Sequence, residues 1–417
     1  MKKSLFALAA TTAFAGAAQA QSSVTVYGLI DAGYVGYNTR AASGTNVTKT
    51  TGNSFTSNAE STSRLGFKGT EDLGGGASAF FTVELGLSGA DSTSGFKNSS
   101  STENRQSFVG LKKNGIGDFA FGTQYTLIQQ SAAQTSASGL NNILGDMIYT
   151  SGTGFATNGY GTAQGATATD GFGAGLPYTI RTQNTLTLNS ETIAGFKIHG
   201  AIVMKNSNST QTTTAGSSAY TGGTNNQNGW QLGADYTWQK LFVTGAYQSF
   251  SATQAYASTT SAANANINLF GAEQASTLGT NVKDNQFYAA ATYDFGILKA
   301  YAQYVNRKAT AQQNSGWYAK RTGEQIGVKS FITPTIEAWA QGGLGKYTTF
   351  AVPGATVNNP AANLTSWQIG SNYWLSKRTN LYAIYGQVGS SNVAVVNNAN
   401  PASFNASNYA IGMRHTF

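Results

Sequence analysis

Apolar and polar residues alternate strictly over much of the chain, which predicts β-strands with one apolar face. From residue 230, one face carries Trp230, Leu232, Ala234, Tyr236 and Trp238, and the other carries Gln231, Gly233, Asp235 and Thr237. The same two-residue period recurs at residues 286–295 and 367–375. In each segment aromatic residues lie near the ends of the apolar face, with small or aliphatic residues between them. This order is typical of a lipid-facing band ~25 Å tall with an aromatic girdle at each interface.

Short and long connections alternate between these segments. The short ones are Gly, Asn or Pro turns at residues 73–76, 114–117, 191–195, 239–240, 296, 333–335 and 376–378. The long ones, rich in Ser, Thr, Asn and Gly, cover residues 39–57, 89–102, 128–179, 206–228, 252–283, 309–321, 348–363 and 391–404. Eight hairpins predict an all-β fold, a transmembrane antiparallel β-barrel of about 16 strands with short periplasmic turns and long extracellular loops. A barrel of this size leaves a water-filled lumen.

The first twenty residues have the three parts of a secretory signal. Lys2 and Lys3 precede an apolar stretch over residues 5–18, and a small-residue cleavage site, Ala-Gln-Ala, ends at Ala20. No later apolar run reaches the ~18 residues of a transmembrane helix. We expect residues 1–20 to be a cleaved signal peptide and residues 21–417 to form a barrel in the cell outer membrane.

Composition argues against several other functions. Charged residues form 10% of the chain, against ~25% in average soluble domains. The absence of cysteine excludes disulfides, thiolate metal sites and cysteine nucleophiles. The chain has more Lys and Arg than Asp and Glu, but these basic residues form no continuous run, so we predict no nucleic-acid partner. His199 and His415 have neither a second metal ligand nor a Ser or acid partner nearby in sequence, so we predict no metal, no cofactor and no enzyme activity.

Three segments carry a resemblance to a known family. They are Ser-Ser-Val-Thr-Val-Tyr-Gly at residues 22–28, Ser-Arg-Leu-Gly-Phe-Lys-Gly-Thr-Glu-Asp-Leu-Gly at residues 63–74, and the terminal Phe417. With these, the mature chain resembles the general porins, particularly Gram-negative porins of betaproteobacteria. The resemblance implies a homotrimer, a third loop folded into the lumen, and a C-terminal strand offered to the outer-membrane assembly machinery. We further expect contact with the lipid bilayer and with lipopolysaccharide.

Alternation assigns several charged residues to the lumen. Arg64 and Lys68 lie opposite to Leu65 and Phe67, and Glu84 lies opposite to Val83 and Leu85. In residues 180–188 the apolar face, with Ile180, Leu186 and Leu188, is expected to meet lipid, which turns Arg181 inward. In residues 105–112 either face could be outward. Here the resemblance, through Arg followed by Gly-Leu-Lys, places Arg105 in the lumen.

The family's pore constriction is an arginine cluster facing carboxylates on the third loop. By resemblance Arg64, Arg105 and Arg181 match those arginines and Lys68 matches an adjacent basic position, whereas Leu29 stands where some members carry a further basic residue. The third loop holds two acids, Asp146 and Asp170, of which Asp146 is the candidate facing carboxylate. Glu84 would be a second acid, on the wall. Four cations against two or three acids predict moderate anion selectivity. The alternative is that these residues belong to a solvated lumen wall and have no special role.

The leading hypothesis is therefore an outer-membrane porin that forms a passive, water-filled channel for small hydrophilic solutes and ions. One alternative is a substrate-specific porin for an organic anion or phosphate. Another is a secreted β-rich adhesin or binding protein.

Overall fold

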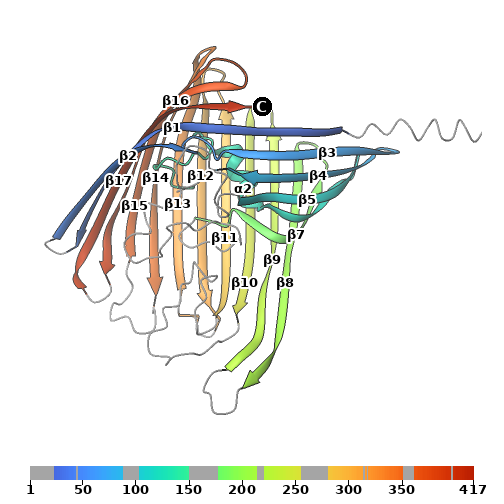
Figure 1. The fold of residues 1–417 in the computed structure, drawn as a ribbon, viewed down its shortest axis with the longest axis horizontal. Coiled ribbons are helices and arrows are strands. Elements are labelled where there is room, and N and C mark those ends of the chain that lie inside the picture. The colour runs from blue at the N-terminus through green and yellow to red at the C-terminus, as the bar shows by residue number, and fades with distance from the viewer. Residues whose placement is uncertain are drawn as a thin grey trace, which may run out of the picture.

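A computed structural model describes residues 23–43, 46–87, 103–149, 177–213, 220–254, 280–312, 315–316, 318–350, 361–395 and 398–417. Most of these residues belong to one antiparallel sheet (Figure 1). The expected signal peptide and Asp170 lie outside the described residues. No described helix is long and apolar enough to cross a membrane.

Seventeen strand segments and one helix follow each other along the described chain. They are β1 (Ser23–Ser43), β2 (Asn46–Ser57), β3 (Arg64–Gly74), β4 (Ala77–Gly86), β5 (Glu103–Lys113), β6 (Gly117–Tyr125), α2 (Leu127–Thr135), β7 (Arg181–Ser190), β8 (Phe196–Thr213), β9 (Tyr220–Trp238), β10 (Leu241–Gln254), β11 (Thr280–Asp294), β12 (Lys299–Ala311), β13 (Tyr318–Thr333), β14 (Ile336–Phe350), β15 (Ala361–Trp374), β16 (Thr379–Val395) and β17 (Asn398–Thr416).

The sheet closes into a sixteen-stranded barrel. On one edge β1 pairs with β17, which joins the two ends of the chain. On its other edge β1 pairs with β2 through residues 32–43 and with β3 through residues 23–29. Because β2 and β3 thus follow one another beside the same strand, they are two halves of a single strand around the barrel. Seventeen segments therefore make sixteen barrel strands, which confirms the predicted fold class.

A buried carboxylate holds the break between β2 and β3. Asp31 on β1 is fully buried, and its Oδ2 accepts hydrogen bonds from the backbone amides of Glu60 (2.7 Å) and Ser61 (2.6 Å). Its Oδ1 accepts a hydrogen bond from the Tyr382 hydroxyl at 2.6 Å. The carboxylate thereby satisfies two of the amides that leave the strand ladder at residues 58–63, which lets the chain bend there at little cost in hydrogen bonds.

The seven predicted short turns are confirmed, but three of the predicted long loops are shorter than expected. Residues 39–57, 206–228 and 391–404 lie mainly in strands, because β1, β2, β8, β9, β16 and β17 extend through them. Their Ser, Thr and Asn content hides the strands from an apolar pattern. Threonine is nevertheless a good strand former, and strands that continue beyond the lipid have no reason to keep an apolar face.

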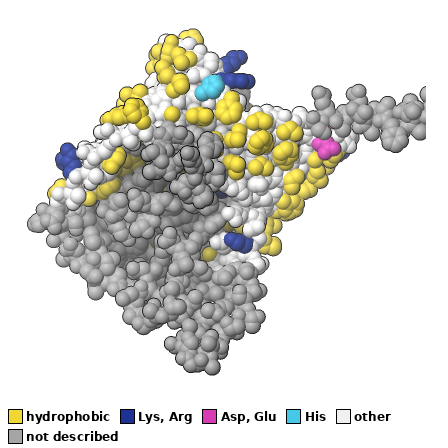
Figure 2. Space-filling model, viewed as in Figure 1, with side chains coloured by type: hydrophobic (Ala, Val, Ile, Leu, Met, Phe, Trp, Pro, Cys, Tyr) yellow, Lys and Arg dark blue, Asp and Glu magenta, His cyan; other side chains and the backbone are white. Residues whose placement is uncertain are grey.

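The two faces of the strands differ in exposure as the alternation predicts. Trp230, Leu232 and Trp238 on β9 are 50%, 57% and 58% exposed, whereas Gln231 between them is 3% exposed. Figure 2 shows hydrophobic side chains collected over the outer surface of β3, β4 and β5. The exposed apolar side chains thus form the outside of the barrel, and the polar side chains line its interior.

The third loop connects β6 to β7, and its described parts, residues 126–149 and 177–180, carry side chains that are buried inside the barrel. Figure 1 shows α2 enclosed by the strands. Leu127, Ile128 and Ala132 of α2 are buried against inward side chains of β10 to β12, among them Tyr288. Ile180 belongs to the same cluster and is 8% exposed. The expectation that Ile180 faces lipid is therefore wrong, because the residue precedes β7 and the strand alternation does not extend to it.

Candidate pore constriction

The predicted lumen charges lie on the wall with the shortest strands. β3 to β7 contain 9 to 11 residues each, and several other strands exceed 15. We call Arg64, Lys68, Arg105 and Arg181 the basic cluster.

Glu84 on β4 connects two members of the basic cluster. Its Oε1 lies 2.7 Å from Nε of Arg105 and 3.9 Å from Nη1 of Arg64. Its Oε2 accepts a hydrogen bond from the Tyr27 hydroxyl at 3.1 Å. Glu84 and Arg105 are both nearly buried. A buried ion pair is tolerated when hydrogen bonds satisfy the remaining polar atoms, and Arg105 Nη2 indeed donates to the Tyr125 hydroxyl at 2.6 Å.

A β-bulge turns Arg105 into the lumen. Glu84 pairs with Gln106 and Leu85 with Asn104, so Arg105 is the extra residue of β5. A bulge re-aims a side chain relative to strict alternation. This explains why the sequence of β5 left both faces open, and the contact with Glu84 places Arg105 on the inner wall as the resemblance implied.

Arg64 is oriented by the chain break that precedes it. Its Nε donates to the carbonyl oxygen of Thr62 at 2.8 Å and its Nη2 to the hydroxyl of Ser61 at 2.9 Å. The side chain keeps 22% of its surface exposed. Arg64 therefore presents a fixed positive charge that is still accessible from the lumen.

Two tyrosines bring the remaining cations into the group. Lys68 Nζ lies 5.4 Å from the ring centroid of Tyr27, and Arg181 Cζ lies 5.6 Å from that of Tyr125. Both are cation–π distances. The structure thus brings together all four residues of the basic cluster, with Glu84 as the acid at its centre.

Asp146 has a different place from the expected one. It is fully buried, and its Oδ1 accepts hydrogen bonds from the amides of Ile148 (2.9 Å) and Tyr149 (2.8 Å) and from Gln325 Nε2 (3.1 Å). Its Oδ2 accepts a hydrogen bond from the Ser138 hydroxyl at 3.0 Å. Asp146 therefore folds the third loop and attaches it to β13, rather than facing the basic cluster across open water.

Sequence reasoning missed the side chains that hold the third loop. Seven inward glutamines, one on each strand from β9 to β15, form what we call the glutamine belt: Gln231, Gln248, Gln286, Gln303, Gln325, Gln341 and Gln368. All are buried. The signal in the sequence was a glutamine on the polar face of each successive strand.

The glutamine belt binds the backbone of the third loop. The amide of Leu127 donates to Gln231 (2.9 Å), that of Met147 to Gln325 (2.7 Å), and that of Thr179 to Gln286 (2.7 Å). Gln368 Nε2 donates to the carbonyl oxygens of residues 143 and 144 at 3.0 and 2.9 Å. A side-chain amide both donates and accepts, as a neighbouring strand would. The belt thus fixes the loop without contributing charge to the lumen.

On the opposite wall two further arginines lie beside one carboxylate. Arg307 is fully buried and its Nη2 lies 2.6 Å from Oδ2 of Asp284. Its cross-strand partner Arg321 donates to the carbonyl oxygen of Met147 at 3.2 Å. These residues therefore support the third loop.

Acids near the β2–β3 break also have cationic partners. Glu60 lies 3.5 Å from Arg414 Nε, and Glu337 lies 3.1 Å from Lys329 Nζ. Each of these two acids thus has a cationic partner within 3.5 Å.

The structure corrects one expectation about His199. It does have an acid partner, because its Nε2 lies 3.1 Å from Oδ2 of Asp235 and its Nδ1 lies 2.7 Å from Oδ1 of Asn189. The nearby hydroxyl of Thr244 contacts the carboxylate (2.6 Å) and not the imidazole. Both ring nitrogens are thus occupied by amide or carboxylate oxygens, which is not the arrangement of an activated nucleophile. No group of three metal-binding side chains occurs among the described residues.

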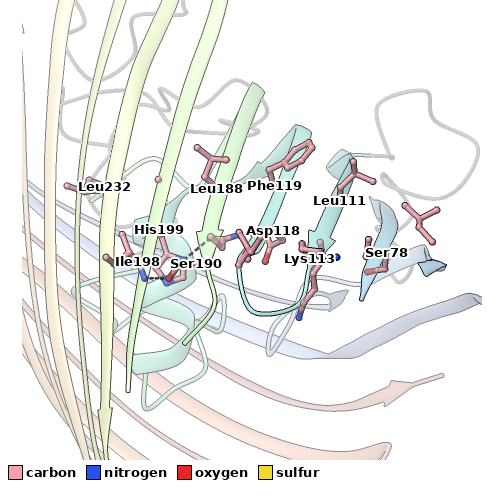
Figure 3. A pocket seen from close by; sticks show the side chains of 17 residues that line it. Ser78, Leu111, Lys113, Asp118, Phe119, Leu188, Ser190, Ile198, His199 and Leu232 are labelled. Atoms are coloured by element: carbon pink, nitrogen blue, oxygen red, sulfur yellow. Dashed lines mark hydrogen bonds between the residues drawn. The ribbon is translucent and has the colours of Figure 1, made fainter. Parts of the chain in front are cut away.

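An apolar groove of about 700 Å³ lies on the outside of the wall that carries the basic cluster. Figure 3 shows Leu111, Phe119 and Leu188 side by side along it, with Lys113, Asp118 and His199 nearer to the short turns. Leu111 and Leu188 are 43% and 50% exposed. The groove is thus a hollow in the apolar outer surface of the barrel.

The comparison with protein families decides the identity of this barrel. The sequence model described as Gram-negative porin matches residues 7–393. The chain belongs to the Gram-negative porin family. It is an outer-membrane β-barrel, as predicted, and membership of this family leaves the secreted adhesin without support.

Curated relatives of this porin match over part of their length. Outer membrane porin protein 32 of Delftia acidovorans is 37% identical over 163 residues, which are 38% of this chain and 43% of the relative. An outer membrane porin protein of Bordetella pertussis is 37% identical over 132 residues, 30% of this chain and 34% of the relative. The matched part therefore spans less than half of either relative.

Solved porin structures share the fold over nearly the whole chain. An anion-selective porin from Comamonas acidovorans superimposes with a TM-score of 0.63 at 19% identity, covering 95% of this chain and 100% of that one. OmpT of Vibrio cholerae gives a TM-score of 0.57 at 12% identity, covering 95% of this chain and 98% of that one. At these identities the likeness is one of fold.

Proposed function

We propose that this porin is a passive, water-filled channel for small hydrophilic solutes and ions with a moderate preference for anions. The observation that carries the proposal is the basic cluster. Its four cations meet one acid, Glu84, on the inner wall. Because rings of charge set the selectivity of pores, an excess of cations favours anion passage.

The size of the preference follows from the local charge balance. Four cations less one carboxylate leave three positive charges on this wall. In water, one unit charge attracts an anion ~8 Å away by about 0.5 kcal/mol, before screening. Three such charges supply about 1.5 kcal/mol, and salt near 0.1 M with a Debye length of ~10 Å reduces this. The expected preference is therefore several-fold rather than absolute.

The position of Asp146 strengthens the proposal. Its carboxylate, expected to oppose the arginines, is buried and hydrogen-bonded to the third loop and to Gln325. It therefore does not offset the basic cluster at the water-filled passage.

Assembly and export belong to the same proposal. We infer that residues 1–20 are removed as a signal peptide and that residues 21–417 form a homotrimer, with the apolar outside of β3 to β5 (Figure 2) as the surface between subunits. We also infer, from the family resemblance, that the assembly machinery recognises the terminal strand. In the closed barrel, Phe417 and Gly28 exchange backbone hydrogen bonds at 3.0 and 3.1 Å.

Paired substitutions in planar bilayers test the proposed selectivity. Arg64→Ala with Arg105→Ala removes two charges of the basic cluster, and Lys68→Ala removes one while leaving the Glu84–Arg105 contact intact. Both are expected to move the zero-current potential in a salt gradient away from anion preference. Lys240→Ala, in the short turn between β9 and β10, removes a charge outside the lumen and should leave the potential unchanged. An unchanged potential in both cluster variants would overturn the proposal.

A further inference from the structure

Two phenylalanines face the lumen between the basic cluster and the short turns. Phe80 is four residues from Glu84 on β4 with no register shift between them, so it shares the inner face with Glu84. Phe108 on β5 pairs with Thr82, which lies on that same face, whereas the next residue, Val109, is 58% exposed on the outside. The two rings lie 6.3 Å apart at 77°, an edge-to-face contact. We call them the inner aromatic pair.

The inner aromatic pair lines a pocket of about 260 Å³. The Phe80 ring lies over its cross-strand partner Gly110, where a Cβ atom would overlap it. Ala120, the partner of Gly110 on β6, also belongs to the pocket and keeps its floor shallow. Sites for drug-sized ligands occupy about 300 to 1,000 Å³. The pocket therefore suits a smaller molecule, one of the size that a porin admits.

Two glutamines contribute polar atoms to this pocket that the described protein leaves unused. Gln106 lies opposite Glu84 because of the bulge in β5, so it faces inward, and its half-buried amide makes no hydrogen bond with the described residues. Gln130 on α2 donates through Nε2 to the carbonyl oxygen of Tyr125 at 3.1 Å, and its Oε1 accepts no hydrogen bond from them. The Gln106 amide in particular offers a donor and an acceptor side by side.

The charges at the two ends of the pocket are already engaged. At the end near the basic cluster, the Tyr125 hydroxyl accepts a hydrogen bond from Arg105, which is itself paired with an acid. At the other end, Asp118 accepts a hydrogen bond from Asn189 Nδ2 at 2.7 Å and lies opposite Lys112. The pocket thus favours a neutral solute over an ion of either sign.

We propose that this pocket is a binding subsite for small neutral aromatic solutes that carry a carboxamide or cyclic amide edge. A planar ring packs against the inner aromatic pair, and an amide edge matches Gln106 because it presents an acceptor and a donor in the reverse order. A polyol lacks the flat aromatic ring. The inference rests on the proposed function, because solutes reach the pocket through a water-filled lumen.

Saturation-transfer NMR with nicotinamide and the detergent-solubilised full protein tests the proposal. Nicotinamide is neutral at pH 7 and combines an aromatic ring with a carboxamide. Phe80→Leu with Phe108→Leu keeps the apolar character and should weaken its binding about tenfold, since each ring contact is lost. Phe81→Leu with Phe121→Leu is the matched control, because these rings alternate with inward residues and lie on the outside. This control should bind as the unmodified protein does.

A blocked ligand tests the amide edge separately. Gln106→Leu should weaken nicotinamide binding about threefold or more. N,N-dimethylnicotinamide has no N–H donor, so the unmodified protein and Gln106→Leu should bind it equally. A similar loss for both ligands would show that Gln106 shapes the pocket without recognising an amide, and would overturn the proposal.

Two further results would overturn it: unchanged nicotinamide binding in the Phe80→Leu, Phe108→Leu variant, or displacement of nicotinamide by an equal concentration of glucose. Heat-modifiability checks that each variant barrel is folded. Because binding is read in detergent, it is independent of ion selectivity. A channel without anion preference would refute the proposed function and leave the binding result standing, whereas absent binding would refute the subsite alone.

Discussion

Replacing Asp146 by alanine should release part of the third loop from the barrel wall. The carboxylate is buried and accepts four hydrogen bonds, from the amides of Ile148 and Tyr149 and from the side chains of Ser138 and Gln325. Alanine leaves all four donors without this acceptor. Asp146→Asn is the matched control, because its amide keeps one carbonyl oxygen for three donors and presents NH₂ to the Ser138 hydroxyl.

The magnitude follows from the hydrogen bonds lost. A hydrogen bond to a charged group contributes about 1.5 to 3 kcal/mol. Four such contributions do not add, because water reaches the donors once the segment opens and neighbouring effects are coupled. A net loss of about 3 kcal/mol in the docking of residues 138–149 is a reasonable value, and it corresponds to a ~150-fold rise in the open population.

Hydrogen exchange measured by mass spectrometry on the full protein reads this population. Peptides covering residues 138–149 should exchange about 100-fold faster in Asp146→Ala, whereas peptides of β13 should be unchanged. Open-channel noise in planar bilayers should increase at the same time. Exchange within about threefold of the unmodified protein would refute the reasoning, since the four hydrogen bonds would then contribute little to docking.

Three further substitutions probe the charge, the loop position and the lipid face. Glu84→Gln removes the acid at the centre of the basic cluster while keeping its shape, so the zero-current potential should move toward stronger anion preference; a shift toward cations would contradict the charge balance. A Cβ at Gly386 would overlap the carbonyl oxygen of Leu144, so Gly386→Ala should alter single-channel conductance while the barrel stays heat-modifiable, and an unaltered conductance would show that the loop is not seated there. Ile326→Arg places a charge at a position whose side chain is 71% exposed on the lipid face. In vesicles this substitution should lower the free energy of unfolding by about 2 to 4 kcal/mol, with Ile326→Ala as the control. A loss below about 1 kcal/mol would argue against lipid contact.

The barrel could be predicted from sequence because its determinants are local. A two-residue period assigns the faces of β9, β11 and β15, and turn residues locate the seven short connections. The prediction of loops at residues 39–57, 206–228 and 391–404 was wrong because the two-residue period ends before the strands do. Strands outside the lipid have no apolar face to reveal them.

The candidate site was only partly predictable because much of it depends on distant partners. Arg64 and Lys68 follow from alternation, whereas the inward turn of Arg105 depends on the register between β4 and β5. The glutamine belt acts across separations of 104 residues for Gln231 with Leu127, and 227 for Gln368 with Asn141. Neither contact can be predicted from the local sequence pattern of the two segments that it joins.

Burial raises the pKa of the Tyr178 phenol well above its usual range, so the hydroxyl stays protonated and donates to Gln129 at 2.9 Å. This contact between α2 and the returning end of the third loop is therefore retained at any pH at which the barrel would be assayed. Neutral side chains such as those of the glutamine belt hold the loop together with the Asp146 carboxylate. In the channel we propose, the fixed charges of the basic cluster set the selectivity.

The zero-current potential of the unmodified porin in a planar bilayer, across a tenfold gradient of potassium chloride, tests the central claim most directly. The basic cluster predicts a potential with the sign of anion preference, smaller than the ideal limit of about 59 mV. A potential of the opposite sign would show that cations pass preferentially and would contradict the account.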